Sequence, residues 1–219
     1  CSSYTIVKEN VWDEYMKDIT IFDNFINDEE LEEARQFIGE ESLNLHNKDI
    51  GYPEINRRWY FLEEDNCYKK IIIDLKPGAE SIDEMEDIIP SAKKFILKMI
   101  NRIKKRFNKE FVLVRSYLNR QVHGQDVTLH IDDHRPNYYT FLLYIGDITT
   151  ENYDKAGGDL ELKTKEITRI EPFTKRAVLF RGYIPHLAYA PLVPGLTRIS
   201  MAIKLIDTSY QSPFLVSYS

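Results

Sequence analysis

The stretch Thr128-Leu-His-Ile-Asp-Asp133 places a histidine and an aspartate two residues apart. It predicts a short strand, in which successive side chains point to opposite faces, so that His130 and Asp132 point the same way. One imidazole and one carboxylate on one face are two of the three ligands of a facial triad, an arrangement that leaves three coordination positions open and suits ferrous iron. The candidate for the third ligand is His186, in Tyr183-Ile-Pro-His186-Leu-Ala.

The His-x-Asp pair by itself is a weak signal. Its alternative interpretation is a surface histidine beside a solvated acid, which is the common outcome for an isolated match. The pattern of residues that follows the pair decides between the two interpretations.

The length and composition of the chain limit its class. With 219 residues, we expect one sizeable core and a single domain over residues 1–219. The residues are 43% hydrophobic and 29% charged, as in soluble globular proteins, and the net charge of −6 argues against broad binding to nucleic acid or anionic membrane. No apolar run is long enough to cross a membrane and no signal peptide is recognised, so we expect a cytoplasmic protein with reduced cysteines. Because the first residue is Cys1 and not Met, a piece of a longer protein is an open alternative.

The first 110 residues predict helical support and outer strands. Ile19-Thr-Ile-Phe22 is typical of a strand, and the acidic start of residues 29–38 is typical of a helix N-terminus. Apolar residues at helical spacing predict a longer helix over residues 85–108, and lysines and arginines cover its other faces. Because the chain as a whole is acidic, we interpret these basic residues as a solvated helix face, with a nucleic-acid footprint as the alternative. Arg57-Arg58-Trp59-Tyr60-Phe61 is interpreted as an edge strand, with a substrate-gripping flap as the alternative.

From residue 111 the pattern changes to short strands separated by turn signals. Such spacing predicts an antiparallel sandwich or barrel, and the helices before it make the fold class α+β. We expect this core over residues 111–206, with a polar loop at residues 146–156. The expected strands are Phe111–Leu118, Val127–Asp132, Tyr138–Ile145, Asp159–Leu162, Ala177–Arg181, His186–Ala190 and Thr197–Leu205.

Arg198 is the most informative residue of the last expected strand. An arginine within an otherwise apolar strand is costly to bury unless it meets an anion, and its planar fork matches a carboxylate at two points. Tyrosine and serine hydroxyls on this and neighbouring strands would complete the shell of a bound carboxylate. The alternative is that Arg198 pairs with an internal aspartate or glutamate.

Taken together, these elements resemble the iron(II)- and 2-oxoglutarate-dependent dioxygenases, specifically the branch that contains the prolyl 4-hydroxylases. The resemblance covers roughly the C-terminal half of the chain, and its strength lies in the order and spacing of elements that are each weak alone. The matching segments are Tyr117, His130-Ile-Asp132, Tyr139-Thr-Phe-Leu-Leu-Tyr144-Ile, Gly157-Gly-Asp-Leu160-Glu-Leu, Ile170-Glu-Pro-Phe-Thr-Lys-Arg-Ala-Val-Leu-Phe180, Pro185-His186 and Gly195-Leu-Thr-Arg198-Ile-Ser200.

The resemblance implies a double-stranded β-helix core (a jelly-roll, cupin-like fold) that N-terminal helices support on one sheet. It implies that His130, Asp132 and His186 are the iron ligands and the catalytic centre. It also implies a set of cosubstrate contacts: Arg198 and Tyr144 for the distal carboxylate of 2-oxoglutarate, Thr140 and Leu160 in the pocket wall, and Ser200 and Tyr117 nearby.

The activity implied by the resemblance is hydroxylation of an unactivated C–H bond. Its cofactors would be Fe(II), 2-oxoglutarate and O2, with ascorbate as a supporting reductant, and its products would include succinate and CO2. A prolyl residue in a peptide or protein is the expected substrate, by family analogy. The alternatives are hydroxylation of a free amino acid or other small molecule, and a jelly-roll binding module without turnover. We expect no nucleic-acid or membrane partner.

Three further histidines need interpretation. His134 and His123 flank the His-x-Asp pair, and a zinc site is conceivable, but histidines four apart bridge a metal best on a helix and this stretch is predicted to be extended. We therefore expect Asp133 and His134 to shape the turn after the pair. His46 is expected on the surface.

Overall fold

The computed structural model describes residues 6–8, 18–39, 59–75, 85–87, 89 and 91–210. For residues 6–8, 74–75 and 85–87 it describes the path of the backbone alone. The expectations for Arg57-Arg58 and His46 therefore lie outside the described residues.

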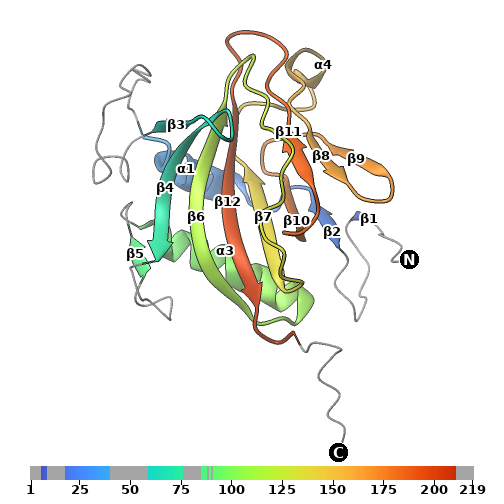
Figure 1. The fold of residues 1–219 in the computed structure, drawn as a ribbon. Helices are drawn as coiled ribbons and strands as arrows, with labels where there is room; N and C mark the ends of the chain where they lie inside the picture. Colours follow the sequence, from blue (N-terminus) through green and yellow to red (C-terminus); the bar gives the residue numbers. More distant parts are fainter. Residues whose placement is uncertain are drawn as a thin grey trace, which may run out of the picture.

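Two β-sheets form the body of the described structure (Figure 1). The larger sheet has the order β1-β2-β10-β7-β12-β6-β4-β3, with β5 also paired to β4, and the smaller sheet has the order β11-β8-β9. All described strand pairs are antiparallel except β1 with β2. The strands are β1 (Ile6–Lys8), β2 (Ile19–Phe22), β3 (Tyr60–Leu62), β4 (Cys67–Leu75), β5 (Met85–Asp87), β6 (Phe111–Gln121), β7 (Tyr138–Tyr144), β8 (Leu160–Lys163), β9 (Ile167–Ile170), β10 (Ala177–Arg181), β11 (His186–Ala188) and β12 (Arg198–Asp207).

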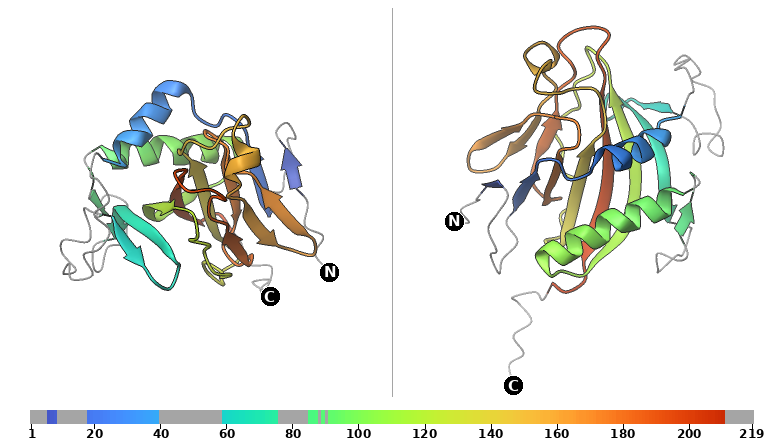
Figure 2. Two further views of the ribbon diagram at one scale, coloured as in Figure 1. Left: turned by 90° about the horizontal axis from the view of Figure 1, so that it is seen from above. Right: turned by 180° about the vertical axis from the view of Figure 1, so that it is seen from behind.

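Two helices cover the outer face of the larger sheet, as the view from behind shows (Figure 2). Helix α1 (Asp28–Gln36) begins at a capping box, in which Asn27 and Glu30 each satisfy the other's backbone N–H. Helix α3 (Ala92–Phe107) packs its apolar stripe on the sheet. A third, short helix, α4 (Tyr153–Ala156), lies in the connection between β7 and β8.

The hydrophobic core has two parts that follow from this layering. One part fills the space between the two helices and the larger sheet and includes Phe22, Phe95, Ile96 and Met201. The other contains side chains of both sheets, among them Tyr144, Leu160 and Phe180. The second part is smaller because the space between the sheets also holds the polar residues that the next subsection describes.

The α+β fold class with a β-sandwich core is confirmed, and most expected strands are present within a few residues. Two expectations are wrong. The helix expected over residues 85–108 begins only at Ala92, because Met85–Asp87 pairs with β4 as a strand instead. Residues 127–132 form a single bridge, at His130, rather than the expected strand.

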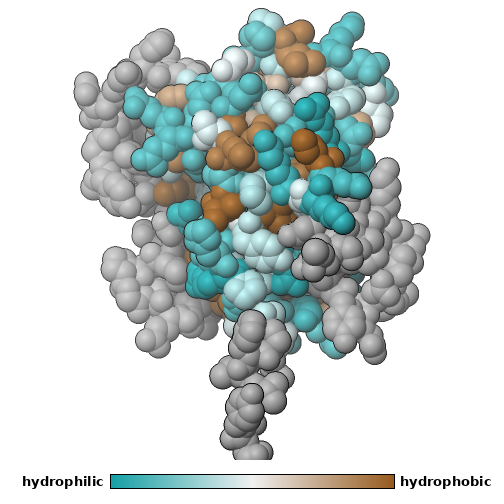
Figure 3. Space-filling view, turned by 45° about the vertical axis from the view of Figure 1, so that its right-hand side comes forward, coloured by the Kyte–Doolittle hydropathy of each residue, from teal (hydrophilic) through white to brown (hydrophobic). Residues whose placement is uncertain are grey.

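The surface carries apolar side chains as separate patches among hydrophilic ones, as one face shows in Figure 3. A hollow of about 860 Å³ follows the basic side of α3. Lys98 and Arg102 on this side form ion pairs with Glu30 of α1, so part of the charge holds the two helices together. In the described part of the chain, no helix is long and apolar enough to cross a membrane.

A pair of isoleucine substitutions tests the packing of α3 on the sheet. Ile96 is fully buried, whereas Ile167 on β9 is 64% exposed. Ile96→Ala should lower the free energy of unfolding by about 2–5 kcal/mol, since a cavity remains in the core. Ile167→Ala should change it by less than about 0.5 kcal/mol. Urea unfolding measures both, and equal losses would contradict the burial of this helix face.

Candidate metal centre

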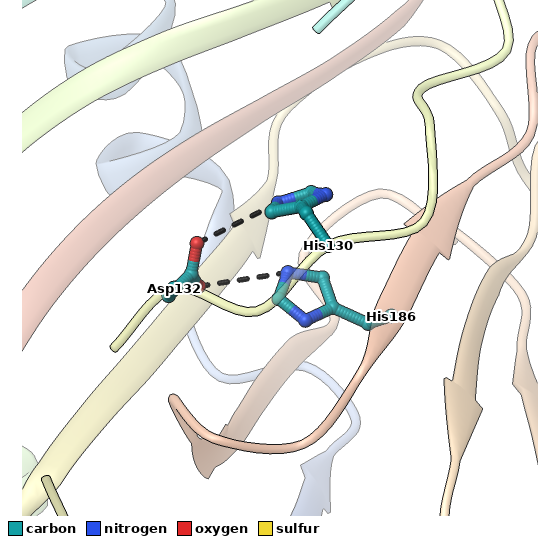
Figure 4. Close-up of side chains that lie close together, drawn as sticks. All are labelled: His130, Asp132 and His186. Atoms are coloured by element: carbon teal, nitrogen blue, oxygen red, sulfur yellow. Dashed lines mark ion pairs between the residues drawn. The ribbon is translucent and has the colours of Figure 1, made fainter. Parts of the chain in front are cut away.

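Two chain segments bring the three expected ligands together (Figure 4). His130 and Asp132 lie in the segment between β6 and β7, and His186 is the first residue of β11. The backbones of the two histidines exchange hydrogen bonds, from N of His130 to O of His186 (3.0 Å) and from N of His186 to O of His130 (2.9 Å). The backbone N–H of Asp132 donates to the carbonyl of Gly182 at 2.8 Å. These bonds fix the positions from which the three side chains converge.

The candidate ligand atoms of the triad lie within 4.8 Å of one another. Nε2 of His130 is 3.6 Å from Oδ1 of Asp132, and Nε2 of His186 is 3.5 Å from Oδ2. The centroids of the two imidazole rings are 4.4 Å apart. This spacing allows a single ion to contact all three side chains after small movements.

The tautomers of both histidines follow from their backbone contacts. Nδ1 of His130 is 2.8 Å from the carbonyl oxygen of Thr128, and Nδ1 of His186 is 2.8 Å from that of Ile184. A carbonyl oxygen only accepts, so each Nδ1 carries a proton, and Nε2 of a neutral ring then presents a lone pair. Two lone pairs therefore face a carboxylate, which is the donor set of a divalent transition metal with both rings oriented by their outer hydrogen bonds.

The charges of the site favour this protonation pattern. Burial lowers the pKa of His186 to about 4, so this ring is neutral at physiological pH. Burial alone would raise the pKa of Asp132, but the nearby Lys204 ammonium and the hydrogen bond with His130 bring it well below its ordinary value. The hydrogen bond to Asp132 raises the pKa of His130 while no metal competes for the ring. The site thus offers an ionised carboxylate and at least one neutral imidazole.

Lys204 is a residue of the site that the sequence reasoning missed. It is a buried lysine of β12, and its Nζ donates to Oδ2 of Asp132 and, at 3.0 Å, to Oγ1 of Thr140. Thr140 in turn donates to Oδ2 at 2.5 Å. A lysine between Ile203 and Leu205 was a signal of the same kind as Arg198, a cation within an apolar strand.

Arg198 lies at the start of β12 and is only 2% exposed. Its Nε donates to the carbonyl of Gly158 (2.8 Å), its NH1 to Oε1 of Gln121 (2.8 Å) and its NH2 to the hydroxyl of Tyr144 (3.2 Å). All three acceptors are neutral, and no carboxylate in the described part of the chain pairs with this guanidinium. The alternative of an internal ion pair is therefore not supported among the described residues.

The buried Arg176 provides a contrast within the same protein. Its guanidinium pairs with the carboxylates of Asp23 (2.6 Å) and Glu171 (2.7 Å), as a buried cation ordinarily requires. Arg198 has only dipoles around it, and two of its five N–H groups have no acceptor among the described residues. This difference indicates that Arg198 is arranged for an anion that binds.

Ser200 adds a second unsatisfied group beside Arg198. Its side chain is fully buried and lines the cavity, and its Oγ has no hydrogen-bond partner among the described residues. Buried hydroxyls are rarely left without a partner, so this one also indicates a polar ligand.

One cavity of about 50 Å³ joins the candidate ligands to the anion position. Of the nine residues expected in the site, Tyr144 contacts Arg198 from behind, and the others line this cavity. Cavity residues that the sequence reasoning did not identify are Asp65, Cys67, Lys69, Asn119, Gln121, Val127, Leu142, Ala188 and Lys204. Asp65, Cys67 and Lys69 belong to the β3–β4 hairpin, whose sequence carries no motif. Burial raises the pKa of the Cys67 thiol to about 11, so it is a protonated wall residue.

The two neighbouring histidines lie outside the triad. His123 contacts the carbonyl oxygen of Pro191 through Nδ1 at 3.0 Å, and His134 is exposed. Asp133 accepts from the backbone N–H of Arg135 at 2.8 Å and pairs with its side chain. The expected turn-shaping role is therefore confirmed for Asp133.

No protein-family model matches this sequence, and no curated protein matches it. Solved structures do resemble the fold. A 2OG-Fe(II) oxygenase family oxidoreductase from Burkholderia pseudomallei aligns with a TM-score of 0.61 at 11% identity, over 94% of this chain and 95% of that one. A prolyl hydroxylase from Trichoplax adhaerens, in complex with a hypoxia inducible factor peptide, aligns with a TM-score of 0.55 at 18% identity, over 89% and 88%.

A third similar structure is HygX from Streptomyces hygroscopicus, bound to nickel, 2-oxoglutarate and hygromycin B, with a TM-score of 0.55 at 9% identity over 89% of this chain and 84% of that one. At these identities the similarity establishes the fold. The resemblance that the motifs indicated is thus confirmed at the level of architecture: this chain has the fold of the 2OG-Fe(II) oxygenases, the prolyl hydroxylases among them.

Proposed function

We propose that this protein is an Fe(II)- and 2-oxoglutarate-dependent dioxygenase that hydroxylates an unactivated C–H bond. In this proposal His130, Asp132 and His186 hold the iron. Arg198, with Tyr144 behind it and Ser200 beside it, receives the distal carboxylate of 2-oxoglutarate. Thr140, Leu160 and Tyr117 complete the pocket wall.

The observation that carries the proposal is the environment of Arg198, which is buried without a carboxylate partner among the described residues. A buried guanidinium without a carboxylate partner is costly, and it opens into the same cavity as a set of three metal-ligand atoms. A dianion with one end at Arg198 and the other at the metal would neutralise the guanidinium and complete the coordination of the metal. 2-Oxoglutarate has this form, because a carboxylate lies at one end and a keto-carboxylate chelating group at the other.

The cofactors would supply the oxidation. The reaction consumes one O2 and one 2-oxoglutarate, and it converts a C–H bond to C–OH with release of succinate and CO2. The residues of the chain would bind and orient: the outer hydrogen bonds of both imidazoles keep Nε2 aimed at the ion, and Arg198 fixes the direction of the cosubstrate. The apolar walls at Leu142 and Leu160 limit the entry of water.

Within this class we propose a prolyl residue of a peptide or protein as the substrate. Support comes from the similar structures named as prolyl hydroxylases, which are 16–18% identical to this chain, including a viral collagen prolyl hydroxylase. A small-molecule substrate is the alternative, since HygX was solved with hygromycin B. A binding module without turnover is less well supported, because all three candidate ligands and Arg198 are in place.

The metal assignment is tested with Asp132→Ala, which removes the carboxylate ligand. The variant should lose affinity for Fe(II) by more than the roughly 10- to 100-fold that loss of an outer partner costs. Anaerobic titration of metal-free protein with ferrous iron measures this loss. His134→Ala is the matched control, because this exposed histidine lies four residues from His130, and it should bind iron as the parent does. An equal loss in both variants would refute the assignment.

The cosubstrate assignment is tested with Arg198→Met. In the iron-loaded parent protein, anaerobic addition of 2-oxoglutarate should produce the visible charge-transfer band of the chelate. The variant should need about 10- to 100-fold more 2-oxoglutarate, the range for one charged hydrogen-bonding group. Its affinity for iron should not change.

Arg176→Met is the matched control, since it removes a buried guanidinium that does not line this cavity, and it should leave the 2-oxoglutarate requirement unchanged. A normal 2-oxoglutarate requirement in Arg198→Met would place the carboxylate site elsewhere.

The substrate class is tested by succinate release from 2-oxoglutarate under air. Proline-containing peptides should stimulate release above the level without substrate, whereas free proline and matched peptides with alanine in place of proline should not. Stimulation by the free amino acid alone would favour the small-molecule alternative.

A further inference from the structure

Lys204 occupies a place in the larger sheet from which its side chain contacts one candidate ligand, Asp132. In the register of the sheet, it lies opposite Thr140 on β7 and Arg115 on β6. Its side chain is 4% exposed and passes into the space between the sheets, where it meets Asp132. The sheet thus supplies a rigid base for a cation that contacts the proposed iron ligand.

The contacts of Oδ2 of Asp132 are complete. The hydroxyl of Thr140 donates its single proton to this oxygen, and the ammonium of Lys204 donates to it as well. The ammonium also donates to Oγ1 of Thr140, so that the three side chains form a closed ring of hydrogen bonds. A carboxylate oxygen has two lone pairs, and both are engaged at Oδ2. Oδ1 has neither of these donors.

We propose that Lys204, together with Thr140, is a positioning residue that reserves Oδ1 of Asp132 as the sole oxygen offered to the metal. The inference rests on the proposed function. Its consequence concerns the number of open positions: two imidazoles and one oxygen leave three positions of an octahedron, whereas two imidazoles and two oxygens leave two. Three positions accommodate a two-point chelate and O2, and two do not. Lys204 thereby keeps a position free for the reaction.

A second lysine of the cavity, the half-buried Lys69, allows a matched comparison. Lys69 lies 4.7 Å from the centre of the Tyr117 ring, and Lys204 lies 5.8 Å from it, so both place positive charge in the same part of the cavity. The carboxylate partner of Lys69 is Asp65, not Asp132. Removal of Lys69 therefore changes the charge of the cavity without changing the contacts of Asp132.

The experiment uses cobalt(II) in place of iron, because its visible d–d absorption changes with the identity and arrangement of its ligands and needs no turnover. Lys204→Met and Lys69→Met are each titrated with cobalt and then with 2-oxoglutarate under anaerobic conditions. We expect Lys204→Met to bind cobalt but to show an altered d–d spectrum and an affinity for 2-oxoglutarate about 10-fold lower or worse, the scale of an outer-shell contribution. Lys69→Met should keep the parent spectrum.

Lys204→Gln removes the positive charge but keeps an N–H donor, so it separates the effect of the hydrogen bond from that of the charge. It also replaces Lys204→Met in the experiment if that variant does not fold. Its amide N–H can still donate to Oδ2, so it should keep a spectrum closer to that of the parent. Thermal unfolding of each metal-free variant identifies a protein that has lost its structure.

Three results would overturn the proposal. A parent-like spectrum and affinity in Lys204→Met would mean that Asp132 is positioned without it. Equal losses in Lys69→Met would mean that positive charge alone matters. A parent protein that binds no cobalt would contradict both the proposed function and the role of Lys204. If the parent binds cobalt and 2-oxoglutarate, the proposed function stands, and the variants then test the role of Lys204 alone.

Discussion

The candidate site depends on one pair of backbone hydrogen bonds, those that His130 and His186 exchange. They join segments that are far apart in the chain, and they are the one bridge that residues 127–132 make. Gly182 supports the same junction, because a Cβ there would approach Cδ1 of Tyr138 to 2.6 Å while its carbonyl accepts from Asp132. A side chain at this position would push the loop away from the strand that holds it. The convergence of the three ligands is thus a product of backbone pairing and close approach, before any metal is considered.

The C-terminal half of the fold and most of the candidate site were predictable because each signal was local. Alternation across two residues brings His130 and Asp132 to one side, and it does so even though the segment is not a strand. The same alternation on β12 places Arg198, Ser200 and Lys204 on the inner face. What could not be predicted was which side chains contact one another across the sheet. The hydrogen bonds of Thr140 with Asp132 and with Lys204 depend on the register of β7 with β12. No local sequence pattern contains that register.

The two buried cations of β12, Arg198 and Lys204, have opposite electrostatic surroundings. Lys204 has a carboxylate within the protein, and this pairing satisfies the charge in the absence of any ligand. Arg198 has only neutral hydrogen-bond acceptors, so its positive charge is not neutralised by any described carboxylate. Burial of an unpaired cation lowers the stability of the fold, and an anionic ligand that binds beside it would offset this loss. The strand therefore carries one cation that contacts a candidate metal ligand and another that has no carboxylate partner among the described residues.

The N-terminal half completes the cavity through the β3–β4 hairpin. Asn66 donates to the carbonyl of Asp126 at 3.0 Å, and Thr128 donates to the carbonyl of Glu64 at 3.2 Å, so the turn of the hairpin rests on the segment that leads to His130. This contact holds the hairpin beside the cavity, which Lys69 lines. The candidate ligands and the anion position come from the half with recognisable motifs, whereas part of the wall that a substrate would meet comes from a hairpin with none. Because wall residues select by shape and charge rather than by coordination, they have no fixed spacing, and for this reason the sequence identifies the chemistry more readily than the substrate.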